Sequence, residues 1–326
     1  MAVLVVGGSG YIGSHAVRAL KRNGYEAIIY DNLSTGHRHF SDGFELVVGD
    51  IADHKQLQSV LKRVDSVMHF AAHAYVGESV ENPRKYFRNN VESALTLLNA
   101  VLDAGVRRVV FSSSCAVYGM PEKVPIKEGT PRQPVNPYGV TKLFFENALE
   151  AYGQAYGIQH ACLRYFNAAG ADEGGTIGEL HDPETHLIPL ALAAAAPGSA
   201  VLKVFGDDYP TPDGTCIRDY IHVNDLAEAH VRALRHLENG GESFALNLGT
   251  GRGHSVLEIV QAVEKASGQP VRRQTVPRRP GDPPILVADT SRAEQLLNWR
   301  ATRSIDDIVS TAWNWMNEAK SSHSSR

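Results

Sequence analysis

The chain has 326 residues, enough to bury a large core and to form about two domains with a cleft between them. Its 32 basic and 36 acidic residues give a net charge of −4, so nucleic acid and anionic membranes are not expected partners and small-molecule chemistry is favoured. The three cysteines, Cys115, Cys162 and Cys216, are widely spaced, which excludes a disulfide framework or a C-x-x-C site and fits a reducing cytoplasm.

The first predicted strand and helix enclose a glycine-rich turn. Residues 3–6, Val-Leu-Val-Val, have the continuous apolar pattern of a strand buried on both faces, and they lack the basic segment of a secretory signal. Gly7, Gly10 and Gly13 follow at once, and a helix is predicted over 14–22. Glycines at this place permit a tight turn and let the backbone approach a pyrophosphate, whose charge the helix N-terminus favours. This context predicts a dinucleotide site.

An acidic residue ends the second predicted strand, which covers 26–30. Asp31 lies eighteen residues after Gly13, where a carboxylate can accept hydrogen bonds from the adenosine ribose hydroxyls and repel the extra phosphate of NADP. NAD is therefore the expected cofactor, although Arg38 is a weak hint of NADP. The other interpretation is that Asp31 is only a turn residue before Asn32.

Strands and helices then continue to alternate, which indicates a doubly wound parallel sheet. Ligands of such sheets lie at the carboxyl ends of the strands. Three polar or small segments follow strand ends here, namely Asp50-Ile51, Phe70-Ala71-Ala72 and Ser112-Ser113-Ser114. We expect strands over 44–48, 67–70 and 108–111, and helices over 54–62 and 89–104.

A tyrosine and a lysine lie four residues apart at the start of the next predicted helix. Asn136 is a good N-cap and Pro137 a good first residue, so Tyr138 and Lys142 project from one helix face. A cation beside a phenol lowers its pKa, which would make Tyr138 a base. Ser114 is expected opposite, near enough to share a substrate hydroxyl. The pair could instead belong to an ordinary amphipathic helix, and Ser114 could be a capping or turn serine.

The character of the sequence changes after Arg164. A glycine-rich acidic loop over 170–184 precedes an alanine-rich helix, 187–196, which is too short to cross a bilayer, so no membrane span is expected. We place the dinucleotide-binding domain at 1–168, with contributions from about 216–250, and a smaller α/β lobe at 169–326. Within this second half we expect a strand end and helix over 219–237, a strand over 244–248 and a helix over 256–267.

Two kinds of polar group in the sequence resemble ligand sites: an arginine-rich loop, and histidines close to one another or to carboxylates. Arg278 and Arg279, near Asp282, form a basic loop suited to a phosphate, or else a solvated arginine pair. His69 and His73 lack a carboxylate pair at ligand spacing, and we interpret them as polar groups without a metal. The same interpretation applies to the loop group of His181, Asp182, Glu184 and His186. No metal is therefore expected. A nucleophile elbow and a Gly-Lys-Ser/Thr loop are missing, which argues against a serine hydrolase and a P-loop kinase.

Taken together, the motifs resemble those of the extended short-chain dehydrogenase/reductase family, and within it the NAD-dependent UDP-glucose 4-epimerases. The resemblance runs from Val3 to about Trp315 and depends on motif order and spacing. Dehydratases of the same family typically carry Thr-Asp-Glu where this chain has Ser113-Ser114-Cys115. The motifs are Gly7-x-x-Gly10-x-x-Gly13, Asp31-Asn32, His69-Phe70-Ala71-Ala72, Ser112-Ser113-Ser114, Tyr138-x-x-x-Lys142, Leu163-Arg164-Tyr165-Phe166-Asn167 and Arg218-Asp219-Tyr220-Ile221-His222-Val223.

This resemblance implies a Rossmann-type sheet and interconversion of UDP-galactose and UDP-glucose through a 4-keto sugar that turns over in the pocket. Tyr138 would exchange the proton of the sugar 4-hydroxyl, Ser114 would share the hydrogen bond, and Lys142 would tune the tyrosine and hold the nicotinamide ribose. Further implied NAD contacts are Tyr11, Ile12, Asp31, Asn32, Asp50, Ile51, Phe70, Ala71, Ala72, Asn89 and Phe166. Implied UDP-sugar contacts are Asn167, Arg218, Arg279, Asp282 and Leu286.

Two departures from the family pattern leave alternatives open. Some relatives have a lysine near the cofactor where this chain has Ala74. Leu286 aligns with a position that gates sugar size, and leucine is intermediate, so UDP-N-acetylhexosamines stay an alternative. The UDP-arabinose/xylose pair is a second alternative, because UDP-pentose epimerases share nearly all of these motifs. A non-catalytic NAD-binding regulator is disfavoured by the intact Ser114, Tyr138 and Lys142. The resemblance also implies a homodimer through the helices near 89–104 and 141–156.

Overall fold

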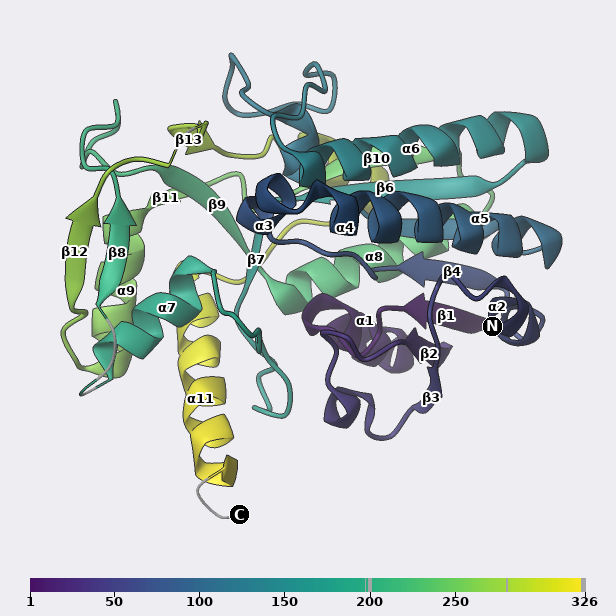
Figure 1. Cartoon of the computed structure of the whole chain (residues 1–326), viewed down its shortest axis with the longest axis horizontal. Coiled ribbons are helices and arrows are strands. Elements are labelled where there is room, and N and C mark those ends of the chain that lie inside the picture. The colour runs from purple at the N-terminus through teal and green to yellow at the C-terminus, as the bar shows by residue number, and fades with distance from the viewer. Residues whose placement is uncertain (197, 199–200, 280, 324–326) are drawn as a thin grey trace.

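A parallel β-sheet with helices on both faces forms the larger part of the molecule (Figure 1). The computed structural model describes residues 1–196, 198, 201–279 and 281–323. Within these residues the sheet has seven strands in the order β10-β6-β5-β4-β1-β2-β3, and every neighbouring pair is parallel. The strands are β1 Ala2–Val6, β2 Glu26–Asp31, β3 Glu45–Val48, β4 Ser66–His69, β5 Arg108–Ser112, β6 Gln159–Tyr165 and β10 Phe244–Leu248.

The continuous apolar run of β1 is explained by burial on both faces of this sheet. Val3 and Val5 pack into one core with helices α1 and α8, whereas Leu4 and Val6 pack into the other with α2, α5 and α6. Alternate strand residues point to opposite faces, so only a sheet covered twice needs such a sequence. The covering helices are α1 Tyr11–Arg22, α2 His54–Leu61, α5 Ala94–Asp103, α6 Pro137–Tyr156 and α8 Val223–Glu238.

A smaller lobe lies beyond the carboxyl ends of the sheet strands (Figure 1). In the described part of the chain it contains a sheet in which β9 pairs with β7, β11 and β13, and a separate parallel pair of β8 and β12. Helices α7, α9 and α11 share one apolar core against these strands, while α10 packs on β10 and α8. The elements are β7 Asn167–Ala169, α7 Leu187–Ala195, β8 Leu202–Phe205, β9 Ile217–His222, β11 Gly253–Ser255, α9 Val256–Ser267, β12 Arg273–Val276, β13 Ile285–Leu286, α10 Ser291–Leu297 and α11 Ile305–His323.

The structure has the doubly wound fold that the sequence predicts, with one notable local difference. The expected helix over 89–104 starts as a π-helical segment, Arg88–Ser93, before α5. Here the Asn90 side chain bonds to both the backbone N–H and the carbonyl of His73, at 2.9 Å each, which holds the widened turn against the end of β4. Short helical segments also precede or join the larger elements, namely η1 Arg38–Ser41, α3 Val76–Glu81, α4 Pro83–Phe87 and η3 Cys115–Tyr118.

Membrane insertion through a helix finds no support in the described residues. None of the helices there combines the length and the apolar character that crossing a bilayer requires.

Candidate active site

The glycine-rich turn forms a close-packed cradle at the start of α1. Gly7 has a positive φ of 81°, and a Cβ there would lie 2.5 Å from the Ala71 amide nitrogen at the end of β4. A Cβ on Gly13 would lie 2.1 Å from the Gly7 carbonyl oxygen. The helix N-cap is Gly10, which makes no side-chain capping bond. The first amides of α1 therefore have no side-chain cap, which suits the binding of a dinucleotide pyrophosphate.

Replacing Gly13 by alanine should disrupt this cradle. The added methyl group would overlap the Gly7 carbonyl, so the turn and α1 must separate and the amides lose their common direction. We expect the Gly13→Ala variant to be purified with little NAD, as measured by absorbance after denaturation. Gly77→Ala is a suitable control, because Gly77 also lies near the start of a helix, α3, but has open space around its Cβ position. Equal NAD content in Gly13→Ala and the parent protein would contradict the cradle.

Asp31 lies beside this cradle at the end of β2. Its carboxylate accepts hydrogen bonds from the Ser9 and Leu33 amides, at 2.9 and 2.8 Å, and burial raises its pKa. The Asn32 side chain donates to Asp50 at 2.9 Å, so the predicted residues at the ends of β2 and β3 lie together. The position of Asp31 fits the recognition of an adenosine ribose, because the cradle and the carboxylate share the Ser9 contact.

The other predicted cofactor residues lie around the same edge of the sheet. The Phe70 and Ala71 amides donate to the Val6 carbonyl, at 2.8 and 3.1 Å, which places this segment next to the cradle. The Tyr11 hydroxyl donates to the Gly170 carbonyl at 2.6 Å, so the side chain points to the smaller lobe and only its backbone belongs to the cradle. The remaining predicted residues differ in their surroundings: Ile12 packs on the α1 side of the core, Ile51 on the opposite side, Phe166 packs with Val117 and Tyr118, and Asn89 donates to Asn90.

Tyr138, Lys142 and Ser114 come together where α6 begins and β5 ends. Asn136 caps α6 by accepting from the Gly139 amide at 2.9 Å, and Pro137 occupies the first turn, as the sequence predicts. Tyr138 and Lys142 are buried, with exposed fractions of 7% and 3%. The Lys142 ammonium donates to the Ser112 carbonyl at 2.7 Å and lies 5.8 Å from the centre of the Tyr138 ring.

Ser114 contacts both its own helix and the tyrosine. Its hydroxyl accepts a hydrogen bond from the Ala116 amide at 3.2 Å, and it lies near enough to the Tyr138 phenol to act against the rise in the phenol pKa. The capping interpretation of Ser114 and the expected contact with Tyr138 therefore both describe this residue. The three side chains form one group at the carboxyl end of β5, beside the cofactor cradle.

The electrostatics of the pair differ from the simple expectation. In the protein alone, burial raises the pKa of Tyr138 well above its usual value, and the nearby Tyr165 adds to this effect, while the Ser114 hydroxyl opposes it. Burial also lowers the pKa of Lys142 to about 7. The tyrosine pKa is therefore raised in the protein alone, because burial outweighs any effect of the lysine. The lowered pKa expected from the lysine is therefore not found in the protein alone, and for the NAD-bound protein it stays a prediction.

A buried ion pair beneath the three residues was missed in the sequence. Glu146 and Arg164 form a bidentate pair at 2.9 and 2.6 Å, and their side chains are 3% and 4% exposed. Ser113 donates to Glu146 at 2.5 Å, and Arg164 donates to the Tyr118 hydroxyl at 2.9 Å. Glu146 follows Lys142 by four residues on α6. This spacing puts a charged side chain on the buried face of the helix, and it was the signal that could have identified the ion pair.

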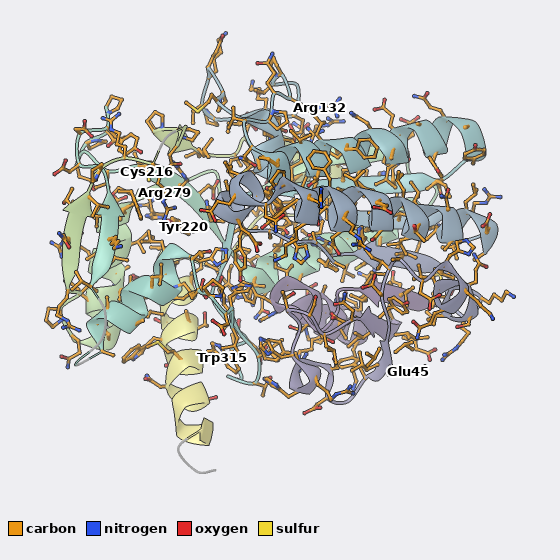
Figure 2. All side chains as sticks on the ribbon, viewed as in Figure 1. Glu45, Arg132, Cys216, Tyr220, Arg279 and Trp315 are labelled. Atoms are coloured by element: carbon orange, nitrogen blue, oxygen red, sulfur yellow. The ribbon has the colours of Figure 1, made fainter. Side chains whose placement is uncertain are left out.

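The predicted substrate residues lie in the smaller lobe. Arg218 on β9 donates to Asp282 and pairs in register with Leu286 on β13. Asn167 donates to the Asp219 carbonyl at 3.1 Å. The Arg279 guanidinium lies 3.9 Å from the centre of the Phe205 ring. Figure 2 shows Cys216, Tyr220 and Arg279 near one another in this lobe.

The two neighbouring arginines of the basic loop have different partners. Arg278 donates to the Asp208 carboxylate at 2.5 Å and lies over the Tyr209 ring, away from Phe205, the aromatic partner of Arg279. The structure therefore does not join them in one forked site. Leu286 packs against the group that contains Phe166, which places the predicted size-gating residue beside a predicted cofactor contact.

Comparison with known proteins identifies the family. The model of the NAD dependent epimerase/dehydratase family matches residues 3–249. The UDP-glucose 4-epimerase of Rhizobium meliloti (strain 1021) is 51% identical over 315 residues, which cover 96% of each protein. A crystal structure of UDP-glucose 4-epimerase from Brucella ovis in complex with NAD has 52% identity and a TM-score of 0.94, covering 96% of this chain and 97% of that one.

A second solved structure extends the likeness to a nucleotide complex. The UDP-glucose 4-epimerase from Bifidobacterium longum in complex with NAD+ and UDP has 39% identity and a TM-score of 0.93, covering 98% of this chain and 99% of that one. Both the sequence and the fold thus match these enzymes over nearly their whole length. The chain belongs to the NAD-dependent epimerase/dehydratase family and, within it, to the UDP-glucose 4-epimerases.

Proposed function

We propose that the chain interconverts UDP-galactose and UDP-glucose by reversible oxidation at sugar C4, with NAD as a resident cofactor. The observation that carries this proposal is the buried group of Ser114, Tyr138 and Lys142 beside a glycine cradle with Asp31 at its edge. The full-length similarity to enzymes named UDP-glucose 4-epimerase supports it. The N-acetylhexosamine, pentose and non-catalytic alternatives have no comparable support.

In this proposal the side chains manage a proton at the sugar 4-hydroxyl. Tyr138 takes that proton and later returns it to the C4 oxygen of the turned keto sugar, so it acts as base and then as acid. Ser114 shares the hydrogen bond and fixes the sugar oxygen beside the phenol. NAD, when bound, supplies a hydride acceptor that is restored within each turnover. Lys142 holds the nicotinamide ribose and supplies positive charge next to the tyrosine.

The remaining residues are proposed to bind the cofactor and the nucleotide. Arg218 and Arg279 would neutralise the UDP pyrophosphate, with Asp282 orienting Arg218 through the hydrogen bond already present. Asn167 and Leu286 would line the sugar side of the pocket. We propose residues 1–168, with α8 and β10 from the part near 216–250, as the NAD domain, the rest mainly as the UDP-sugar lobe, and galactose metabolism in the cytoplasm as the setting. The proposed NAD contacts are Gly7, Gly10, Tyr11, Ile12, Gly13, Asp31, Asn32, Asp50, Ile51, Phe70, Ala71, Ala72, Asn89, Tyr138, Lys142 and Phe166.

The direct test is turnover of the purified protein with UDP-galactose, with the product separated by chromatography. We expect UDP-glucose to form with NAD present, and absence of this product would contradict the proposal. The same assay with UDP-N-acetylhexosamines and UDP-pentoses ranks the substrates by kcat/KM. A much higher value for the pentose pair would replace the hexose proposal.

The proposed role of Lys142 predicts a change in pH dependence. Removing its positive charge raises the pKa of Tyr138 in the NAD-bound protein, so less of the phenolate exists at any given acidic pH. We therefore expect the acidic limb of the kcat profile of Lys142→Ala to move to higher pH. Lys62→Ala, a change at an exposed lysine, is the control. An unchanged acidic limb in Lys142→Ala would contradict this role.

A homodimer is also proposed, through α6 and the helices beside it. Val140 and Phe144, four residues apart on α6, are 38% and 42% exposed, and Phe87 on α4 is 40% exposed. Large apolar side chains gathered on one helix face favour burial by a partner. Light scattering during gel filtration should give twice the 35.5 kDa mass of the chain. A monomeric mass would contradict the dimer.

A further inference from the structure

The loop between β7 and α7 brings together four side chains that the proposed reaction does not use. They are Glu179, His181, Glu184 and His186, and one potential ligand atom from each lies within 4.8 Å of all the others. From the sequence we interpret the histidines as polar surface, in a group with Asp182. In the structure Glu179, and not Asp182, belongs to the group, and the resulting set of four side chains has the composition of a metal site. We propose that the four side chains bind a divalent zinc ion.

The spacing of the ligand atoms fits tetrahedral coordination. His181 Nδ1 lies 3.3 Å from Glu179 Oε1 and 3.5 Å from Glu184 Oε2. His186 Nδ1 lies 2.9 Å from Glu179 Oε1 and 2.8 Å from Glu184 Oε1. Zinc bonds of about 2.0–2.1 Å place neighbouring ligand atoms of a tetrahedron about 3.3 Å apart. The two distances from His181 already match, and the two from His186, one of them to the other Glu184 oxygen, need to open by about half an ångström as one Glu184 oxygen takes the ligand position.

One of the ligand atoms is a buried nitrogen without a hydrogen bond, and this favours ion binding. His181 Nδ1 is buried and makes no hydrogen bond of acceptable geometry, although both carboxylates are near it. Burying a polar nitrogen without a hydrogen bond is unfavourable, and a bond to zinc removes that cost. The Glu179 side chain is only 7% exposed, so a carboxylate charge is also withdrawn from water at this place.

The charges of the site balance with zinc. Two carboxylates neutralise a doubly charged ion when both imidazoles are neutral, as metal binding requires. With four protein ligands and no open position, the ion would be structural.

The site lies where the loop meets the dinucleotide-binding part of the molecule. The His181 ring makes edge contacts with the Tyr11 and Tyr75 rings, with centres 6.2 and 6.0 Å apart. The Tyr11 hydroxyl also donates to the Gly170 carbonyl near the start of the loop. Zinc would thus fix both the loop and its contact with the first residue of α1.

The C-terminal helix holds the same loop from the other side. Trp315 on α11 donates from Nε1 to the Glu179 carbonyl at 3.1 Å, and its ring lies 5.8 Å from that of Phe40. In Figure 2 Trp315 projects from α11 toward the α1 side of the molecule. Stabilisation by zinc should therefore raise the unfolding temperature of the whole chain rather than order a free tip.

The test is metal content and thermal unfolding of the full chain, purified without affinity-tag histidines. Elemental analysis should find a single zinc ion per chain after dialysis in zinc, and chelation with EDTA should lower the Tm by about 4 °C, reversed by added zinc. This shift is what a ligand at roughly a hundredfold excess over its Kd gives a chain of this length. Cobalt in place of zinc should give the strong visible absorption of a tetrahedral site.

The matched variants are His181→Gln, which removes a ligand, and His54→Gln, which changes an exposed histidine bonded to Asp103. We expect His181→Gln to lose both the metal and the response to EDTA, and His54→Gln to keep both. Metal retained unchanged in His181→Gln would place it elsewhere and overturn the proposal. So would a parent protein that binds no zinc and whose Tm does not respond to it. If His181→Gln does not fold, Glu184→Gln and the parent protein decide the outcome.

Discussion

Tyr138→Phe should lower kcat by a factor of about 10³, since positioned general acid–base groups typically contribute 10²–10⁴. The change removes only the phenol oxygen, which lies near Ser114, and it leaves the buried ring in place. Folding and NAD content should therefore remain those of the parent protein. Steady-state turnover of UDP-galactose, together with NAD released on denaturation, measures both effects.

The control is Tyr25→Phe, which removes a hydroxyl that donates to Glu238 at 2.5 Å on the far end of α8. This variant should turn over at the parent rate, because no predicted site residue contacts that hydroxyl. If Tyr138→Phe kept more than about a tenth of the parent kcat, the general-base role of Tyr138 would be wrong. A parallel loss of NAD would instead indicate that the hydroxyl serves binding.

Glu146→Gln should destabilise the protein by about 3–5 kcal/mol, because it leaves the buried Arg164 charge without a partner. Glutamine can keep a hydrogen bond to Ser113 and to Arg164 but carries no charge. Urea unfolding followed by circular dichroism gives the free energy of unfolding.

The control for this change is Glu150→Gln, four residues further along α6 and exposed to solvent. Exposed charges contribute little, so its free energy of unfolding should change by less than about 0.5 kcal/mol. A double variant, Glu146→Leu with Arg164→Met, removes both charges and should recover much of the stability. If Glu146→Gln were as stable as Glu150→Gln, the ion pair would not contribute to the fold.

Local patterns were enough to predict the elements that carry the Rossmann sheet. The apolar run over 3–6 predicted burial on both faces, and Val3 and Leu4 do lie in different cores. Asn136 and Pro137 predicted the start of α6, because capping depends only on the residues of the turn itself. Such features are encoded within a few positions, so one sequence is sufficient to find them.

Features that depend on distant partners could not be predicted in this way. The two residues of β13 become a strand only by pairing with β9, almost seventy positions earlier in the chain. Arg278 and Arg279 look like one basic pair in the sequence, yet in the structure Arg278 binds Asp208 and Arg279 lies over the Phe205 ring. The proposed zinc ligand Glu179 lay outside the predicted histidine group for the same reason, because loop folding, not spacing, brings it there.

The position of β10 at the edge of the sheet has a consequence for synthesis on the ribosome. Strand β6 ends at Tyr165, but its outer neighbour in the sheet, Phe244–Leu248, is made only after β7, α7, β8, β9 and α8. Until then the β6 backbone has an unpaired side, and apolar residues such as Leu163 lack the contacts of Leu246 and Leu234. A nascent chain that stops near residue 168 would expose an unpaired, aggregation-prone sheet edge. Chaperone contact is therefore expected until β10 has been synthesised.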